Sequence, residues 1–437
     1  MTRVATVLLF MLFVISIHAA PELVVHEWGT FTCLQDENGR AIGGINTDDE
    51  PVPAFVHNAA PGLLIPADGE QTKSVAKCHA QVTMRLETPV VYFYPNEEFS
   101  SRLNVDVRFR EGWLTQFFPD AAVSALGLRP DGTGLVMGYG HLGWNGITLS
   151  ASDEGPATNS LVWKTPRQVD AATVEVSGEH EKFLFYRGVG HVEAPVRVVR
   201  KEQEFMMTRE RPGERPDEIS QLWLADIRED GSAAVRVVEP FTKETAFLVR
   251  TSSSFAPEEY SPDAIKNLKA AMREALLEAG LFEKEADAML NTWQASYFQT
   301  PGLRVFFLVP PRWTGSTLPF RLSEHRKDPK QPPAFEAKVI RVMIGRIEIV
   351  TPYQRELLGQ ISAPGSDLSD DEWKQRFATY QRLGRFRNAL VLDEQKRHPG
   401  SGVDQFIERF RLQGYNPKPR DFGLSIPHLD SAPPHVR

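Results

Sequence analysis

Cysteine is scarce in this sequence, with two residues, Cys33 and Cys78, among 437. Cys78-His79 ends like the attachment motif of a c-type haem, but no cysteine precedes it at the required spacing, which excludes that cofactor. In an oxidising compartment the pair predicts one disulfide, which would close a loop of about 45 residues and contribute roughly 4 kcal/mol of stability. Two buried free thiols, or a thiolate bound to a metal, are the alternatives.

The sequence also lacks the short motifs of common enzyme classes. No Gly-x-Ser-x-Gly turn places a nucleophilic serine, and no glycine-rich pattern lies between a strand and a helix as nucleotide binding requires. His26-Glu27 is not followed by a second histidine one helical turn later, because Thr30 stands there, so the zinc-peptidase motif is absent. No motif by itself therefore indicates a catalytic class.

Blocks of lysine and arginine are missing as well. The chain carries 49 basic and 57 acidic residues, which gives a formal net charge of −8. Nucleic-acid binding needs a basic face that neutralises phosphates, so we predict no nucleic-acid partner. The acidic excess weakly favours the binding of cations.

The N-terminus carries the most specific pattern in the chain. Arg3 is followed by a nearly unbroken apolar run from Val4 to Ile17 and then by His18-Ala19-Ala20. A positive residue, an apolar run too short for a comfortable membrane span and a small-residue exit are typical of a secretory signal peptide. We expect cleavage of residues 1–19 and export to the periplasm, the cell surface or the medium; an uncleaved N-terminal anchor is the alternative. No later stretch approaches 18 apolar residues, so no transmembrane segment is expected after cleavage.

Short alternating segments predict a β-rich first half. Residues 103–109 alternate apolar and polar side chains, which is the pattern of a half-buried antiparallel strand. Similar segments recur up to residue 251, separated by turn residues such as Ser177-Gly178. This spacing predicts an antiparallel β-sandwich region at 20–255, with a long glycine- and proline-containing loop at 34–80.

The pattern changes near residue 256, where an α+β helical region is predicted to begin. Two segments with helical spacing, at about 261–280 and 284–298, predict an αα-hairpin. Two strands follow, at 303–309 and 338–350. They could rejoin the sheets of the first half, which would make one interwoven body.

Helices are also predicted at the C-terminal end of this region, which extends to residue 415. The capping box Ser369-Asp-Asp-Glu372 opens a long helix to about residue 397. A last helix covers 403–413, and the proline-rich residues 416–437 are expected to form a flexible tail. The predicted class is therefore β-rich α+β, with a β-sandwich region followed by an α+β region.

Two groups of polar residues in the first half could build a metal site. Asn46-Thr-Asp-Asp-Glu50 supplies closely spaced oxygen ligands of the type that Ca²⁺ prefers, without the spacing of an EF-hand. Six of the eleven histidines lie in the β half, where the loops of a sandwich converge. Candidate ligands of a divalent metal such as Zn or Ca are His26, Asp48, Asp49, His57, His79 and Glu87. The alternatives are a solvated acidic turn and independent histidines, with His26 hydrogen-bonded beside a buried tryptophan.

Tyr139 and Trp144 lie in a glycine-rich run. Exposed there, the two rings would form a platform that stacks on a sugar or another ring-shaped ligand. The alternative is that they cap the core of the sandwich.

Several segments together are distinctive. They include His26-Glu-Trp-Gly-Thr-Phe-Thr32, Asn46-Thr-Asp-Asp-Glu-Pro-Val-Pro53, Met84-Arg-Leu-Glu-Thr-Pro-Val90, Phe185-Tyr-Arg-Gly188 and the stretch from Trp293 to Trp313. Over about residues 24–360 the chain resembles a family of exported bacterial proteins that has no established activity. The resemblance implies export and a shared fold, and it supplies no catalytic residues.

Two functions from different classes are compatible with these observations. The first is a non-catalytic envelope or periplasmic protein that binds a glycan or an envelope protein partner. The second is a metal-dependent hydrolase that uses the candidate ligands above. Convergence of three of those side chains on one point would favour the hydrolase.

Overall fold

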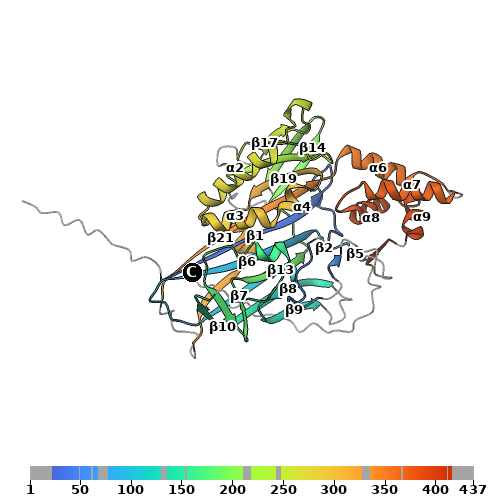
Figure 1. Ribbon diagram of the computed structural model, residues 1–437. Helices are drawn as coiled ribbons and strands as arrows, with labels where there is room; N and C mark the ends of the chain where they lie inside the picture. Colours follow the sequence, from blue (N-terminus) through green and yellow to red (C-terminus); the bar gives the residue numbers. More distant parts are fainter. Residues whose placement is uncertain are drawn as a thin grey trace, which may run out of the picture.

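A computed structural model describes residues 22–48, 50–60, 63–66, 77–128, 135–152, 155–209, 218–242, 248–326, 335–365, 368–410 and 412–415. The fold is β-rich α+β, as predicted, and most of its helices come from the C-terminal part of the chain (Figure 1). The expected signal peptide 1–19, the expected tail 416–437 and Asp49 lie outside the described residues. In the described part of the chain, no helix is both long and apolar enough to cross a membrane.

Nine strands form the central sheet, in the order β17-β16-β19-β21-β1-β6-β13-β8-β3. Their bounds are β1 (Leu23–Gln35), β3 (His57–Asn58), β6 (Met84–Pro95), β8 (Gly112–Phe118), β13 (Leu184–Gly190), β16 (Leu222–Ile227), β17 (Ala233–Val238), β19 (Gly302–Leu308) and β21 (Ala337–Ile349). β1 and β21 pair in parallel along their whole length, whereas β1 and β6 are antiparallel. The strands predicted near 303 and 338 thus rejoin the sheet of the first half, and the sheet is mixed rather than purely antiparallel.

Smaller sheets complete the β structure. One contains β12 (Glu179–Glu181), β11 (Thr173–Val176), β10 (Leu135–Ser150), β7 (Leu103–Arg110) and β20 (Phe320–Glu324), with β9 (Ala122–Leu128) also paired to β10. Another contains β14 (Val196–Lys201), β15 (Glu204–Arg209) and β18 (Leu248–Ser252). Two pairs remain, β2 (Thr47–Asp48) with β4 (Ile65–Pro66) and β5 (Lys77–His79) with β22 (Gln413–Tyr415).

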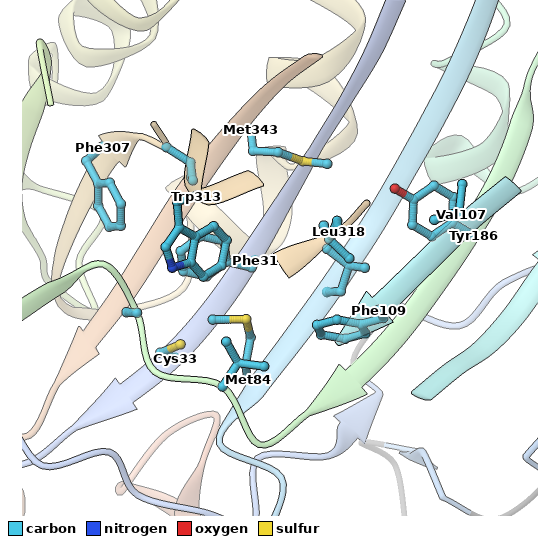
Figure 2. Packing of buried hydrophobic residues seen from close by; sticks show 14 of the residues in the cluster. Phe31, Cys33, Met84, Val107, Phe109, Tyr186, Phe307, Trp313, Leu318 and Met343 are labelled. Atoms are coloured by element: carbon cyan, nitrogen blue, oxygen red, sulfur yellow. The ribbon is translucent and has the colours of Figure 1, made fainter. Parts of the chain in front are cut away.

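The largest hydrophobic core lies on one face of the central sheet. Alternate residues of β1 enter it, among them Phe31, whose ring centroid is 5.9 Å from that of Phe307 and 5.1 Å from that of Trp313. Figure 2 shows Phe31 and Trp313 beside each other, with Met84 and Phe109 in the same core. The alternation of β1 therefore places its other set of side chains on the opposite face.

Three helices cover that opposite face, namely α2 (Ala264–Glu278), α3 (Glu283–Thr292) and α4 (Gln294–Phe298). Trp28 of β1 and Phe306 of β19 pack there against apolar residues of the helices. The predicted αα-hairpin is confirmed, with Gly280 in the left-handed region (φ +103°) between α2 and α3. The second predicted helix is divided at Trp293 into α3 and α4.

Four helices at the C-terminal end form a third core with Leu34 and Trp113 from the sheet. They are α6 (Pro352–Ser362), α7 (Asp370–Gln381), α8 (Arg387–Arg397) and α9 (Gly402–Arg409). The single helix predicted up to residue 397 is wrong, because the chain turns between α7 and α8 at Gly384, whose φ is +84°. Short helices elsewhere are α1 (Leu161–Lys164), α5 (Pro311–Thr317) and the 3-10 turn η1 (Pro257–Glu259).

Candidate functional site

His26 and Glu27, the first two residues of the distinctive segment from His26 to Thr32, are buried on opposite faces of β1. His26 Nδ1 donates to Glu285 Oε2 of α3 at 2.6 Å, and its ring packs against Tyr94 and Phe282, which also contact each other. Glu27 points to the other face, where it pairs with Arg341 and accepts a hydrogen bond from Tyr186. His26 is therefore a hydrogen-bonded core residue, which was the alternative to a metal ligand.

Glu87 lies where β6, β1, α4 and the loop before α8 meet. Its Oε2 accepts hydrogen bonds from Thr32 Oγ1 and Tyr297 Oη, both at 2.8 Å. Its Oε1 accepts one from Arg385 at 2.6 Å and lies 3.5 Å from a guanidinium nitrogen of Arg85. These contacts assign the carboxylate to a buried ion-pair network that joins four elements.

The network continues along the same face of the sheet. The Arg346 guanidinium carbon lies 4.4 Å from the centroid of the Tyr297 ring, and Arg346 also pairs with Glu348. Burial lowers the pKa of Arg304 to about 10, although the neighbouring Glu348 opposes that shift. Burial raises the pKa of Glu348, but Arg304 and Arg346 outweigh that effect and lower it. The arginines keep this carboxyl group charged, and together they brace the sheet against α4.

The predicted disulfide is not formed. Cys33 and Cys78 are both buried free thiols. Cys33 belongs to the core shown in Figure 2, whereas Cys78 on β5 contacts the backbone turn at Gly44. Burial raises the pKa of Cys78 to about 12 and that of Cys33 further, so both groups are protonated and poor metal ligands.

The other candidate ligands whose side chains are described do not assemble a metal site. His79 is buried, and burial lowers the pKa of its imidazole to about 4. Asp48 contributes backbone pairing to β2, and its side chain lies outside what the structure describes. Within the described ranges, no three His, Cys, Asp or Glu side chains are grouped closely enough to hold a metal ion. His26, His57, His79 and Glu87 instead lie in four separate surroundings.

The predicted aromatic platform is not an exposed surface. Trp144 is fully buried in the core, and its Nε1 donates to the carbonyl oxygen of Pro119 at 2.8 Å. The side chain of Tyr139 lies outside the described residues. Trp144 therefore follows the alternative, in which it fills the core.

His57 instead pairs with a residue that lines a pocket of about 360 Å³. This small pocket is lined by Phe55, Phe118, Gly155, Pro156, Gly178, Glu179 and His180. His57 lies beside it on β3, and its Nε2 is 2.9 and 3.1 Å from the two carboxylate oxygens of Glu179. The backbone N–H of Asp120 also donates to Glu179, at 2.6 Å. The carboxylate is thus fixed at the mouth of the pocket while a third of its side chain stays exposed.

Aromatic rings support the other side of the small pocket. The His57 ring stacks at 5.5 Å on Phe117 and at 6.0 Å on Phe118, as measured between ring centroids. Phe55 packs edge-on against Phe118 at 5.0 Å and against Trp163 at 5.2 Å. A ligand in this pocket would meet both aromatic side-chain atoms and the Glu179 carboxylate.

A second, larger groove of about 850 Å³ lies next to the small pocket. Its lining includes Tyr94, Leu149, Ser150, Arg167, Gln168, Asp170, Glu181, Lys182 and Lys284. Glu181 is fixed by Trp163 Nε1 at 2.7 Å and by two nitrogens of Arg167 at 2.6 and 2.9 Å. At the rim, Lys284 of α3 pairs with Asp170 at 2.6 Å.

The sequence pointed to His57, as a candidate metal ligand, but not to its partner Glu179. The turn Ser177-Gly178 was the available signal, because it predicts a hairpin that presents the residues following it. Ser177 and Gly178 do have positive φ values, of 56° and 80°, between β11 and β12. The pairing itself spans 122 positions, and no local pattern reports it.

No protein-family model and no curated protein matches the chain. One solved structure with some likeness is the Fcho1 mu homology domain of Danio rerio with bound Eps15 peptide, at 7% identity and a TM-score of 0.28. Another is the yeast delta-COP-I mu-homology domain complexed with Dsl1 WxWxV peptide, at 9% identity and a TM-score of 0.23. Each match covers 75% of this chain and 96% of the other. TM-scores this low assign neither a fold family nor a ligand.

Proposed function

We propose that this is an exported protein that binds a glycan, without catalysis, in the small pocket beside His57 and Glu179. The observation that carries the proposal is a partly exposed, fixed carboxylate, Glu179, in the same pocket lining as the aromatic side chains Phe55 and Phe118. The N-terminal pattern from Arg3 to Ala20 supports export.

Sugars present two kinds of surface, and the small pocket has a partner for each. The C–H face of a pyranose packs against an aromatic ring, which the half-buried Phe55 offers, supported by the buried Phe118 that it packs against. Hydroxyl groups donate to an ionised carboxylate, which makes a stronger hydrogen bond than a neutral acceptor. The volume of about 360 Å³ lies within the range of ligand pockets and suits one or two sugar units.

The test is a glycan array probed with the mature protein, followed by calorimetry on the strongest array sugar. We expect Glu179→Gln to weaken binding by about 10- to 100-fold, because a hydrogen bond to a charged group contributes about 1.5–3 kcal/mol. The substitution keeps the shape of the side chain, so the thermal unfolding midpoint should change little.

His141→Ala is the matched control. His141 pairs with Asp106 at 3.0 Å, and the two side chains are 28% and 34% exposed, close to the 34% and 31% of His57 and Glu179. This pair lines neither cavity, so the control should bind the array sugar like the unchanged protein. Absence of any array signal, or equal binding by Glu179→Gln and the unchanged protein, would reject the proposal. Selective capture of peptides would also count against it.

A further inference from the structure

The small pocket and the larger groove share a wall. Arg167 donates to Glu181 on the groove side and to the carbonyl oxygen of Pro156, which lines the small pocket, at 2.8 Å. A Cβ on Gly155 would lie 3.1 Å from Arg167 and 3.3 Å from Glu181, so the two linings are in contact.

One strand passes both cavities. Glu179 of β12 lines the small pocket, and Glu181 of the same strand lines the groove. Two residues of strand span about 7 Å, so the adjoining ends of the cavities are about one sugar unit apart. A ligand that extends from the small pocket past Arg167, whose side chain is 22% exposed, would enter the groove.

The groove repeats the mixed chemistry of the small pocket. Tyr94 and Leu149 provide apolar contact area, whereas Ser150, Gln168 and Lys182 provide hydrogen-bonding groups. The cations of the groove are largely balanced, since Arg167 pairs with Glu181 and Lys284 with Asp170. A groove of this kind suits an uncharged, hydroxyl-rich chain better than a polyanion.

From this geometry we propose that the ligand is a linear, neutral oligosaccharide that occupies both cavities at once. The inference rests on the proposed glycan binding and specifies its ligand. The small pocket holds one end of the chain, and the groove holds the following units. Affinity therefore increases with chain length until the groove is filled.

The test uses the full mature chain and two defined series of probes. These are β-1,4-linked oligomers of glucose and of N-acetylglucosamine, from one to six units, titrated by calorimetry. In at least one series we expect about a tenfold gain in affinity between the dimer and the tetramer, equivalent to about 1.4 kcal/mol. Equal affinity for short and long oligomers, or no binding by any member, would overturn the inference.

Ala151→Trp separates the two cavities. Ala151 is exposed and lines the groove, so a tryptophan fills the groove without displacing core atoms. We expect this variant to bind the dimer normally and to lose the gain seen with the tetramer, whereas Glu179→Gln weakens both. Glu229→Trp, at an exposed turn that lines neither cavity, is the control. If Ala151→Trp keeps the full affinity for the tetramer, the groove is not part of the binding site. Glycan binding in the small pocket would be unaffected by that result.

Discussion

At the scale of single residues, the His26-Glu27 pair acts as a structural link between layers. His26 holds α3 against the central sheet through Glu285, and Glu27 holds β21 and β13 together through Arg341 and Tyr186. A buried charge that loses its partner retains its desolvation cost. These interactions explain why charged residues are tolerated in the middle of a fully buried strand.

His26→Ala should therefore destabilise the protein severely. Removal of the imidazole leaves Glu285 buried, with the backbone N–H of Phe282 at 2.8 Å and the neighbouring Tyr94 hydroxyl as remaining donors. We expect a loss of about 3–5 kcal/mol in the free energy of unfolding, measured by urea titration. His57→Ala, which breaks an exposed pair of the same residue types, should cost less than about 1 kcal/mol.

A double-mutant cycle with Glu285→Ala tests whether the two side chains act together. We expect a coupling energy of about 1–3 kcal/mol between positions 26 and 285, as for other residues in direct contact. Additive losses would show that the large effect of His26→Ala comes from a cavity and not from the pair.

The sequence predicts which face each of these residues occupies, but not its partner. Period-2 alternation is a local property, so the opposite orientations of His26 and Glu27 follow from the strand alone. Their partners lie 259 and 314 positions away and are fixed by tertiary packing. The four candidate metal ligands whose side chains are described, His26, His57, His79 and Glu87, do not converge for the same reason, since residue type does not reveal which loops meet.

At the scale of elements, the start of α7 was predicted correctly, whereas its end was not. Ser369 caps α7 as expected, with its Oγ accepting the N–H of Glu372 and its own N–H bonded to Glu372 at 2.7 Å. The sequence predicted that this helix continues to about residue 397, because Leu383, Phe386 and Leu390 keep helical spacing across the turn at Gly384. All three lie in the same core on both sides of the break, so the apolar pattern does not report it.

Gly359 in α6 and Gly384 in the turn between α7 and α8 should respond to alanine substitution in opposite directions. Neither Gly359 in α6 nor Gly384 has any atom within 4 Å of an added Cβ, so steric room is equal. Gly384 has φ +84°, a conformation in which alanine lowers the free energy of unfolding by about 1–2 kcal/mol. Gly359 is helical, so its replacement by alanine raises the free energy of unfolding by about 0.5–1 kcal/mol. Thermal and urea unfolding of Gly384→Ala and Gly359→Ala check this. Stabilisation by both would mean that α7 and α8 can join into one helix.

At the scale of the whole molecule, residues from both predicted regions build one sheet and one core. β1 lies between β6 from the first region and β21 from the second, and the largest core contains Val25 and Phe31 together with Phe307 and Met343. Interweaving could be proposed from the sequence because 303–309 and 338–350 have the composition of buried strands. The parallel register of β1 with β21 could not, since it depends on contacts between chain segments more than 300 positions apart.

This architecture predicts that the two regions do not fold separately. A fragment of residues 22–255 lacks β19 and β21, so one edge of β1 loses its hydrogen-bonding partner and apolar side chains such as Phe31 lose their cover. We expect the fragment to bind a hydrophobic dye, to lack near-ultraviolet circular dichroism and to show no cooperative unfolding. Co-expression with residues 256–415 should restore these signals, because β21 can then pair with β1. Cooperative unfolding of 22–255 alone would instead mean that the first region holds a complete core and that β21 docks onto it after folding.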